Sequence, residues 1–221
     1  MIAEPLERSP WSNARWLIMA PHPDDETLGT AALIAHCAAR NRLAAILFLT
    51  DGTGSHPDGT PRVAITRRKE ARHAIGRMGA STTEIIWLGW RDAHPHAVDS
   101  MAFARDAGRL AVLMRRYQID AIAVSDLSEA HCDHVAAYHL AAAAVRRAKR
   151  AVTLFTYHVW SQVPAGIRHV ATPAMLTGRR RHALAAHRSQ MSPTLGDGFR
   201  LPCEKLRMGA RDVLTLRKDR Q

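Results

Sequence analysis

An apolar run leads directly into a cluster of ionisable side chains in the stretch Trp16-Leu17-Ile18-Met19-Ala20-Pro21-His22-Pro23-Asp24-Asp25-Glu26. The first five residues have the composition of a buried β-strand. One imidazole and three carboxylates then follow within five residues. Carboxylates crowded at the end of a buried strand repel one another unless a cation neutralises them or solvent screens them. A divalent metal ion would remove this repulsion, so the stretch indicates a metal site at the end of a strand.

Apolar runs alternate with stretches of helical period along the chain. The runs occupy residues 14–20, 44–50, 84–88, 120–125 and 151–159. A longer amphipathic stretch, with apolar residues at i, i+3, i+4 and i+7, follows each of the first four runs. This alternation predicts right-handed βαβ units and a parallel sheet that is covered on both faces. We therefore predict an α/β fold, a Rossmann-like doubly wound and mostly parallel sheet with helices on both faces.

The length of the chain favours one domain. A chain of 221 residues can bury one substantial core, so we expect a single domain over residues 1–221. The core is expected to span about residues 14–191, followed by a basic C-terminal segment over residues 192–221. Pro- and Gly-rich composition predicts a loop over residues 51–61.

A second ionisable cluster, His131-Cys132-Asp133-His134, follows the fourth predicted strand. In the common doubly wound strand order 3-2-1-4-5, the first and fourth strands are neighbours, and ligands bind where their carboxyl ends diverge. With that order, His22 and His134 lie at the same edge of the sheet. The first turn lacks the G-x-G-x-x-G pattern and carries carboxylates, so it is unsuited to a dinucleotide pyrophosphate.

Composition limits the class of protein and the partners. With 47% hydrophobic and 23% charged residues, the chain has the composition of a soluble globular protein. It lacks an apolar run long enough to span a bilayer and a signal-peptide core, and its three cysteines are scattered. We expect a cytoplasmic protein without membrane insertion, and the sequence leaves its oligomeric state open.

The formal net charge of +11 favours anionic partners. The basic residues form short runs on helices whose other faces are apolar, and only 5% of residues are aromatic. We therefore expect no specific nucleic-acid binding, and the charge favours a small substrate that carries phosphate or carboxylate.

Several motifs of the chain occur together in one enzyme family. The two specific motifs are residues 21–29 and the cluster at residues 131–134. Supporting motifs are Thr50-Asp51-Gly52, Arg67-x-x-Glu70, Leu88-Gly89-x-Arg91-Asp92 and residues 183–190. With these motifs the sequence resembles the PIG-L (LmbE-like) family of zinc-dependent N-deacetylases. It departs from the family pattern where Ala31-Ala32 replaces a Gly pair and where Cys132 replaces a Pro.

The resemblance implies a zinc ion, one per chain, held by His22, Asp25 and His134 with an open position for water. Two neutral imidazoles and one carboxylate leave the ion a positive charge, which lowers the pKa of bound water to about 7. Asp24 is then the expected general base, kept ionised by the metal and by a helix N-terminus. A non-haem iron triad uses the same ligand types, but such triads are better known on β-barrels.

The resemblance also implies roles for four further residues. His131 is expected to stabilise the oxyanion as an imidazolium, and Asp133 to hold it in that state. Arg67 and Asp92 are expected to bind sugar hydroxyls, although Arg67 could instead pair with Glu70 one turn along a helix. In the motif at residues 183–190, a histidine on the apolar helix face is expected to support the site by packing.

These observations predict a zinc-dependent hydrolase that removes an N-acetyl or N-acyl group from an amino sugar or an amino-sugar conjugate. One alternative is an amidase or N-deacylase that acts on a thiol or antibiotic conjugate with the same machinery. The other is a basic nucleic-acid-binding module in which Asp24, Asp25 and Glu26 only cap a helix.

Overall fold

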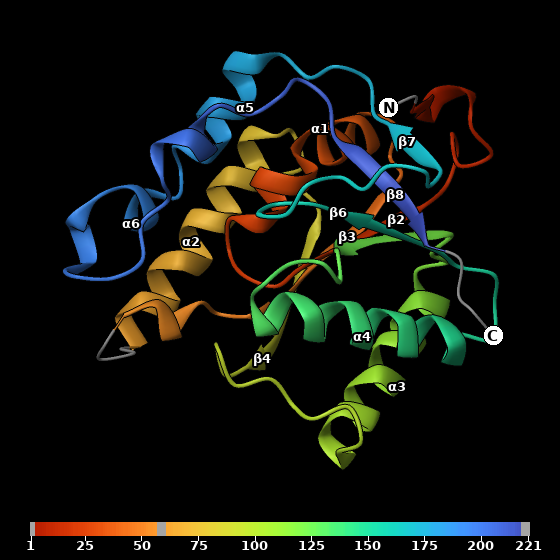
Figure 1. The fold of residues 1–221 in the computed structure, drawn as a ribbon, viewed down its shortest axis with the longest axis horizontal. Helices are drawn as coiled ribbons and strands as arrows, with labels where there is room; N and C mark the ends of the chain where they lie inside the picture. The colour runs from red at the N-terminus through yellow and green to blue at the C-terminus, as the bar shows by residue number, and fades with distance from the viewer. Residues whose placement is uncertain (1–2, 57–60, 218–221) are drawn as a thin grey trace.

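An eight-stranded sheet organises the chain in the computed structural model, which describes residues 3–56 and 61–217 (Figure 1). Its strand order is β1-β7-β8-β6-β5-β2-β3-β4. The strands are β1 (Glu4–Pro5), β2 (Trp16–Ala20), β3 (Leu43–Thr50), β4 (Glu84–Trp90), β5 (Ala121–Ser125), β6 (Thr153–Tyr157), β7 (His169–Ala171) and β8 (Val213–Arg217).

The five strands predicted from the apolar runs form the parallel centre of this sheet. Their order, β6-β5-β2-β3-β4, is the doubly wound order assumed from the sequence, which is thereby confirmed. In register, Ile18 of β2 lies opposite Ile46 of β3 and Ala123 of β5. The carboxyl ends of β2 and β5 are therefore adjacent, and the two ionisable clusters follow these strands.

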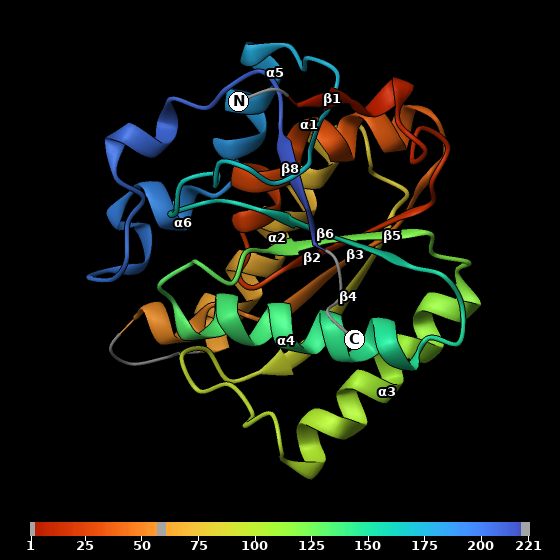
Figure 2. The ribbon, with the colours of Figure 1, turned by 45° about the vertical axis from the view of Figure 1, so that its right-hand side comes forward.

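Helices cover both faces of the sheet, as Figure 2 shows, with α1, α2 and α5 on one face and α3 and α4 on the other. The helices are α1 (Asp25–Ala39), α2 (Pro61–Arg77), α3 (Met101–Arg116), α4 (Cys132–Arg147), α5 (Thr177–Leu184) and α6 (Arg188–Met191). Trp16 and Ile18 pack on the face of the sheet that α1, α2 and α5 cover, and Leu17 and Met19 pack on the face that α3 and α4 cover. Strand β2 is therefore buried on both sides. Within the described ranges, every helix falls short of the length or the hydropathy that a bilayer crossing requires.

The C-terminal segment contributes to the sheet beyond the expected end of the core at residue 191. Strand β8 lies antiparallel between β6 and β7. Its Leu214 is fully buried on the face of the sheet that α1, α2 and α5 cover. The predicted loop over residues 51–61 contains the short turn η2 (Thr53–Ser55), and α2 already begins at Pro61. Residues 57–60 of that loop lie outside the described residues.

Candidate active site

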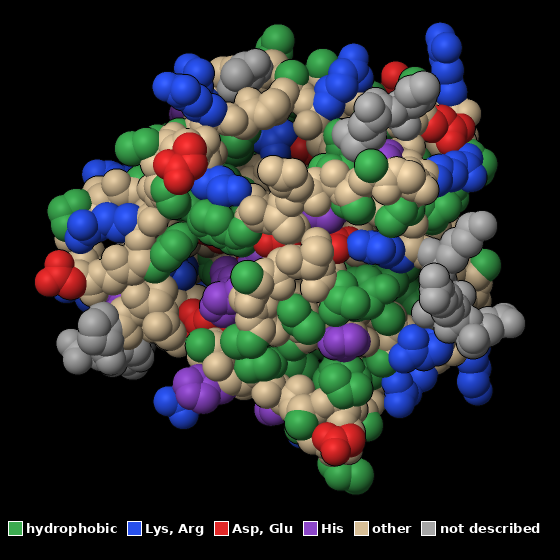
Figure 3. Space-filling view, viewed as in Figure 1, with side chains coloured by type: hydrophobic (Ala, Val, Ile, Leu, Met, Phe, Trp, Pro, Cys, Tyr) green, Lys and Arg blue, Asp and Glu red, His purple; other side chains and the backbone are tan. Residues whose placement is uncertain are grey.

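A pocket of about 190 Å³ opens where the carboxyl ends of β2 and β5 meet. Both ionisable clusters contribute to it, and its lining includes His22, Asp24, Asp25, Asp92, His131 and His134. Figure 3 shows histidine and acidic side chains in a hollow on this face of the molecule, bordered by hydrophobic side chains. The topology thus brings the two halves of the chain to one site.

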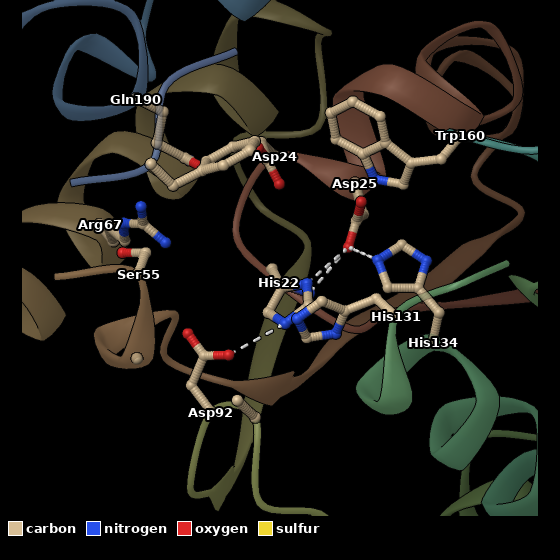
Figure 4. A pocket seen from close by; sticks show the side chains of 13 residues that line it. His22, Asp24, Asp25, Ser55, Arg67, Asp92, His131, His134, Trp160 and Gln190 are labelled. Carbon is tan, nitrogen blue, oxygen red and sulfur yellow. Dashed lines mark hydrogen bonds and ion pairs between the residues drawn. The ribbon is translucent and has the colours of Figure 1, made fainter.

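Three side chains at the floor of this pocket place metal-binding atoms close together (Figure 4). Asp25 Oδ2 lies 3.3 Å from His22 Nδ1 and 3.3 Å from His134 Nε2. The ligand atoms of all three residues lie within 4.8 Å of one another. His22 belongs to the loop after β2, whereas Asp25 begins helix α1 and His134 lies in the first turn of helix α4.

The donor set fits a zinc ion. Donors about 2.0–2.1 Å from a tetrahedral zinc ion lie roughly 3.3 Å apart, and nitrogen and oxygen donors are its usual ligands. Burial lowers the pKa of His22, but the surrounding carboxylates offset this and raise it well above its usual value. Burial raises the pKa of Asp25, but His134 and His22 lower it below its usual range. The electrostatics of the site therefore favour a positive charge between these three residues.

Two more carboxylates orient His22 from its other side. Its Nε2 lies 3.0 Å from Asp133 Oδ2 and 3.2 Å from Asp92 Oδ1. The Ala93 backbone N–H donates to the same Asp133 oxygen at 2.9 Å. A carboxylate on the outer nitrogen fixes the tautomer and orientation of a ligating histidine. Asp133 and Asp92 are therefore placed to leave Nδ1 of His22 free for a metal.

Glu129 occupies the corresponding position behind His134. Its Oε2 lies 3.8 Å from His134 Nδ1, a buried atom without a hydrogen-bond partner. The Glu129 carboxylate also accepts the backbone N–H groups of Val159 and Trp160, at 2.8 and 3.0 Å. Glu129 was not predicted from the sequence, although its position two residues before His131 was the available signal.

Asp24 has a strained backbone and a buried side chain. Its φ of 145° is rare for a residue with a side chain, and such strain persists only where neighbours enforce it. Glu26 provides one such contact, because its Oε2 accepts the Asp24 backbone N–H at 2.9 Å. Its Oε1 lies 3.0 Å from Nε2 of the fully buried His187. Figure 4 shows the Asp24 carboxylate directed into the same cavity as Asp25.

The environment of Asp24 suits a general base. Burial, followed by the negative charge of Asp25, raises its pKa to about 7. A general base works best when its pKa lies near the working pH. A metal cation nearby would favour the ionised form of this carboxylate.

His131 differs from its expected state. Its Nδ1 accepts the Asp133 backbone N–H at 3.2 Å and so caps α4. Burial, followed by the charge of His22, lowers its pKa. Both observations favour the neutral imidazole, which can donate only through Nε2. Asp133 Oδ2 lies 3.9 Å from His131 Nδ1 but 3.0 Å from His22 Nε2. This carboxylate therefore pairs with His22 instead.

Arg67 and Asp92 both line the pocket, as expected of substrate-binding groups. Arg67 Nη1 donates to the Gly52 carbonyl at 2.9 Å, while its buried Nε and Nη2 have no hydrogen-bond partner. Glu70, the alternative partner of Arg67, instead accepts the backbone N–H and hydroxyl of Ser189. The free guanidinium donors are consistent with ligand binding, whereas Asp92 is partly engaged by His22.

Residues 17–145 match the family described as PIG-L: GlcNAc-PI de-N-acetylase. The chain belongs to the PIG-L family. The family resemblance inferred from the motifs is thereby confirmed. Among curated proteins, the sequence of this PIG-L member finds no match.

Solved structures support the fold of this PIG-L member. It is similar to N,N'-diacetylchitobiose deacetylase from Pyrococcus horikoshii, with 19% identity, coverage of 95% of this chain and 86% of that chain, and a TM-score of 0.72. The conserved protein TT1542 from Thermus thermophilus is 25% identical, with 91% and 93% coverage and a TM-score of 0.65. A deacetylase of teicoplanin biosynthesis is 16% identical, with 94% and 100% coverage and a TM-score of 0.69.

Some of the pocket comes from outside the PIG-L match. Trp160, Gln190 and Phe199 line it, although the matched region ends at residue 145. Gln190 donates a short hydrogen bond to the Pro23 carbonyl, which ties the late motif to the first one. The candidate metal site therefore lies in the family region, while residues of the last third of the chain form part of the pocket wall.

Proposed function

We propose that the chain is a zinc-dependent hydrolase that removes an N-acetyl group from an amino sugar or an amino-sugar conjugate. The observation that carries the proposal is the convergence of His22, Asp25 and His134 beside a second carboxylate, Asp24, in one pocket. Three ligands leave room for reactants in a catalytic zinc site, and Asp24 is free to act as a base. Membership of a family named for a de-N-acetylase supports the same reaction.

In this proposal His22, Asp25 and His134 hold one zinc ion per chain. When bound, zinc supplies a Lewis acid for the amide carbonyl and lowers the pKa of water to about 7. Asp24 takes a proton from the attacking water as the water oxygen bonds to the acetyl carbonyl carbon. The same carboxyl then protonates the leaving nitrogen as the C–N bond breaks, and the products are acetate and a free amine.

The remaining pocket residues act on the substrate. The neutral His131 donates its Nε2–H to the carbonyl oxygen as negative charge develops there. Arg67 uses its free Nε and Nη2 donors for sugar hydroxyls or for an anionic group. Asp92 accepts from a hydroxyl with the carboxylate oxygen that does not face His22.

The test measures amine release from N-acetylated amino-sugar conjugates by zinc-loaded protein. Asp24→Asn is expected to keep its zinc and lose about 10²–10⁴-fold in turnover, because it can no longer accept the proton. Asp99→Asn, a matched change at an exposed position, should keep both properties. If the zinc-loaded protein releases amine only from thiol or antibiotic conjugates, the alternative substrate class holds. If it hydrolyses no amide, or if Asp24→Asn is fully active, the proposal is wrong.

A further inference from the structure

Two aromatic side chains form a corner at the pocket wall. Trp160 follows β6 and Phe199 precedes η4 (Cys203–Leu206), and both line the pocket. Their ring centroids lie 6.0 Å apart with the planes at 81°, so the two rings stand nearly perpendicular. Trp160 is 37% exposed and Phe199 is 40% exposed. Among the large hydrophobic side chains exposed in residues 3–56 and 61–217, these two are the aromatic ones.

Hydrogen bonds hold this corner in place from both sides. Glu129, which lies behind the metal-binding His134, accepts the Trp160 backbone N–H at 3.0 Å. The Lys205 ammonium lies 4.7 Å from the centre of the indole ring, and Lys205 lines a different pocket. The Phe199 backbone N–H donates to the Ser55 carbonyl at 2.9 Å. The corner is thus built into the same framework as the candidate metal site.

The corner is chemically distinct from the rest of the pocket. Figure 4 shows Trp160 and Arg67 on opposite sides of the Asp24 and Asp25 carboxylates. Arg67 offers charged hydrogen-bond donors, whereas Trp160 and Phe199 offer exposed apolar ring surfaces. Specific small-molecule pockets combine such apolar walls with a few polar groups that fix orientation. A ligand whose reacting group lies over the carboxylates can therefore place a flat apolar group against the rings.

We infer that the corner is a subsite for a flat apolar group, such as an aryl aglycone, attached to the N-acetylated amino sugar. The inference rests on the proposed function and narrows its substrate class. Each ring contact is worth about two- to twelvefold in affinity, so an aryl group that touches the corner should improve the substrate about tenfold.

The experiment compares three substrates of zinc-loaded protein: the methyl and phenyl glycosides of N-acetylglucosamine, and N,N'-diacetylchitobiose. The expected result is a kcat/KM about tenfold higher for the phenyl than for the methyl glycoside. Trp160→Ala should reduce this ratio to near one, and Phe199→Ala, a change in an exposed loop, should reduce it even if Trp160→Ala is poorly folded. Ile167→Ala removes a side chain of similar exposure outside this pocket and should keep the wild-type ratio.

Equal kcat/KM for the methyl and phenyl glycosides would overturn the inference. A ratio that survives both Trp160→Ala and Phe199→Ala would also overturn it, because the preference would then arise elsewhere. A larger gain for the disaccharide than for the phenyl glycoside would contradict the apolar class, since a sugar carries hydroxyls on its ring.

A binding measurement separates this inference from the proposed function. The methyl and phenyl glycosides are titrated into zinc-loaded Asp24→Asn protein while the quenching of Trp160 fluorescence is followed, with Trp160→Phe to identify the signal. If no substrate is hydrolysed, the proposed function fails, and binding alone decides the inference. About tenfold tighter binding of the phenyl glycoside would support it, and equal or absent binding would refute it.

Discussion

The buried pair of His187 and Glu26 gives a quantitative test of how the fold holds Asp24 in place. His187 Nε2 and Glu26 Oε1 lie 3.0 Å apart, and both side chains are completely buried. Removing one partner of a buried ion pair costs about 3–5 kcal/mol, because the other charge stays buried without compensation. For a domain of this size, 1 kcal/mol shifts the melting temperature by about 2–4 °C. His187→Ala should therefore melt about 6–20 °C below the wild type.

The pH dependence of this loss has a defined direction. Burial lowers the pKa of His187, but the charge and hydrogen bond of Glu26, with the charges of Asp24 and Glu70, raise it overall. A histidine whose pKa is raised by folding stabilises the protein fully below its unfolded pKa of about 6.5. That contribution disappears as the pH rises through the folded pKa. The stability difference between wild type and His187→Ala should therefore be largest below about pH 6.5 and shrink at higher pH.

The assay is thermal and denaturant unfolding of both proteins across this pH range. His182→Ala, which removes an exposed histidine from α5, is the matched control and should melt like the wild type. His187→Ala should also lower kcat more than it changes KM, because Glu26 holds the Asp24 backbone. A loss of less than about 1 kcal/mol, or a difference that grows as the pH rises, would refute the account of this pair.

Two further predictions concern packing and the support of the metal site. A Cβ on Gly29 would lie 2.2 Å from the Tyr157 ring, so Gly29→Ala should cost about 1–3 kcal/mol in unfolding free energy. Gly108→Ala, in an open helical position, should be neutral or stabilising, and equal stability of the two variants would contradict the packing. Glu129→Gln should weaken zinc binding about 10–100-fold and lower the melting temperature, because this carboxylate lies behind His134, one of the three proposed zinc ligands. Glu204→Gln, at an exposed position, should leave zinc affinity unchanged, and a wild-type affinity for Glu129→Gln would exclude the supporting role.

The centre of the sheet could be predicted because its strands are continuous apolar runs. Helices pack on both faces of β2, so Leu17 and Ile18 are both fully buried and the run has no polar interruption. Strands β7 and β8 contain polar residues that the fold buries. Examples are His169 and Thr215, whose Nδ1 and Oγ1 atoms lie 3.1 Å apart. Their burial depends on pairing between distant segments, which a local pattern does not indicate.

The convergence of His22 and His134 could also be predicted, because strand order alone brings their loops to one edge. The pairing of Asp133 with His22 rather than with His131 could not be predicted, because the direction of a side chain in the first turn of α4 depends on its packing. The contact of His187 with Glu26 could not be predicted either. It lies between α5 and α6 with ψ of 57° rather than on one continuous helix face, and its partner Glu26 is far away in sequence.

The metal content of the purified protein tests the central claim most directly. After zinc loading and removal of excess metal, elemental analysis should find one zinc ion per chain, and X-ray absorption should find only nitrogen and oxygen ligands. His134→Ala should lose this stoichiometric zinc, whereas His139→Ala, a histidine change on the same helix outside the donor set, should retain it. A wild-type protein that holds no stoichiometric zinc, or a His134→Ala protein that binds zinc as the wild type does, would contradict the account.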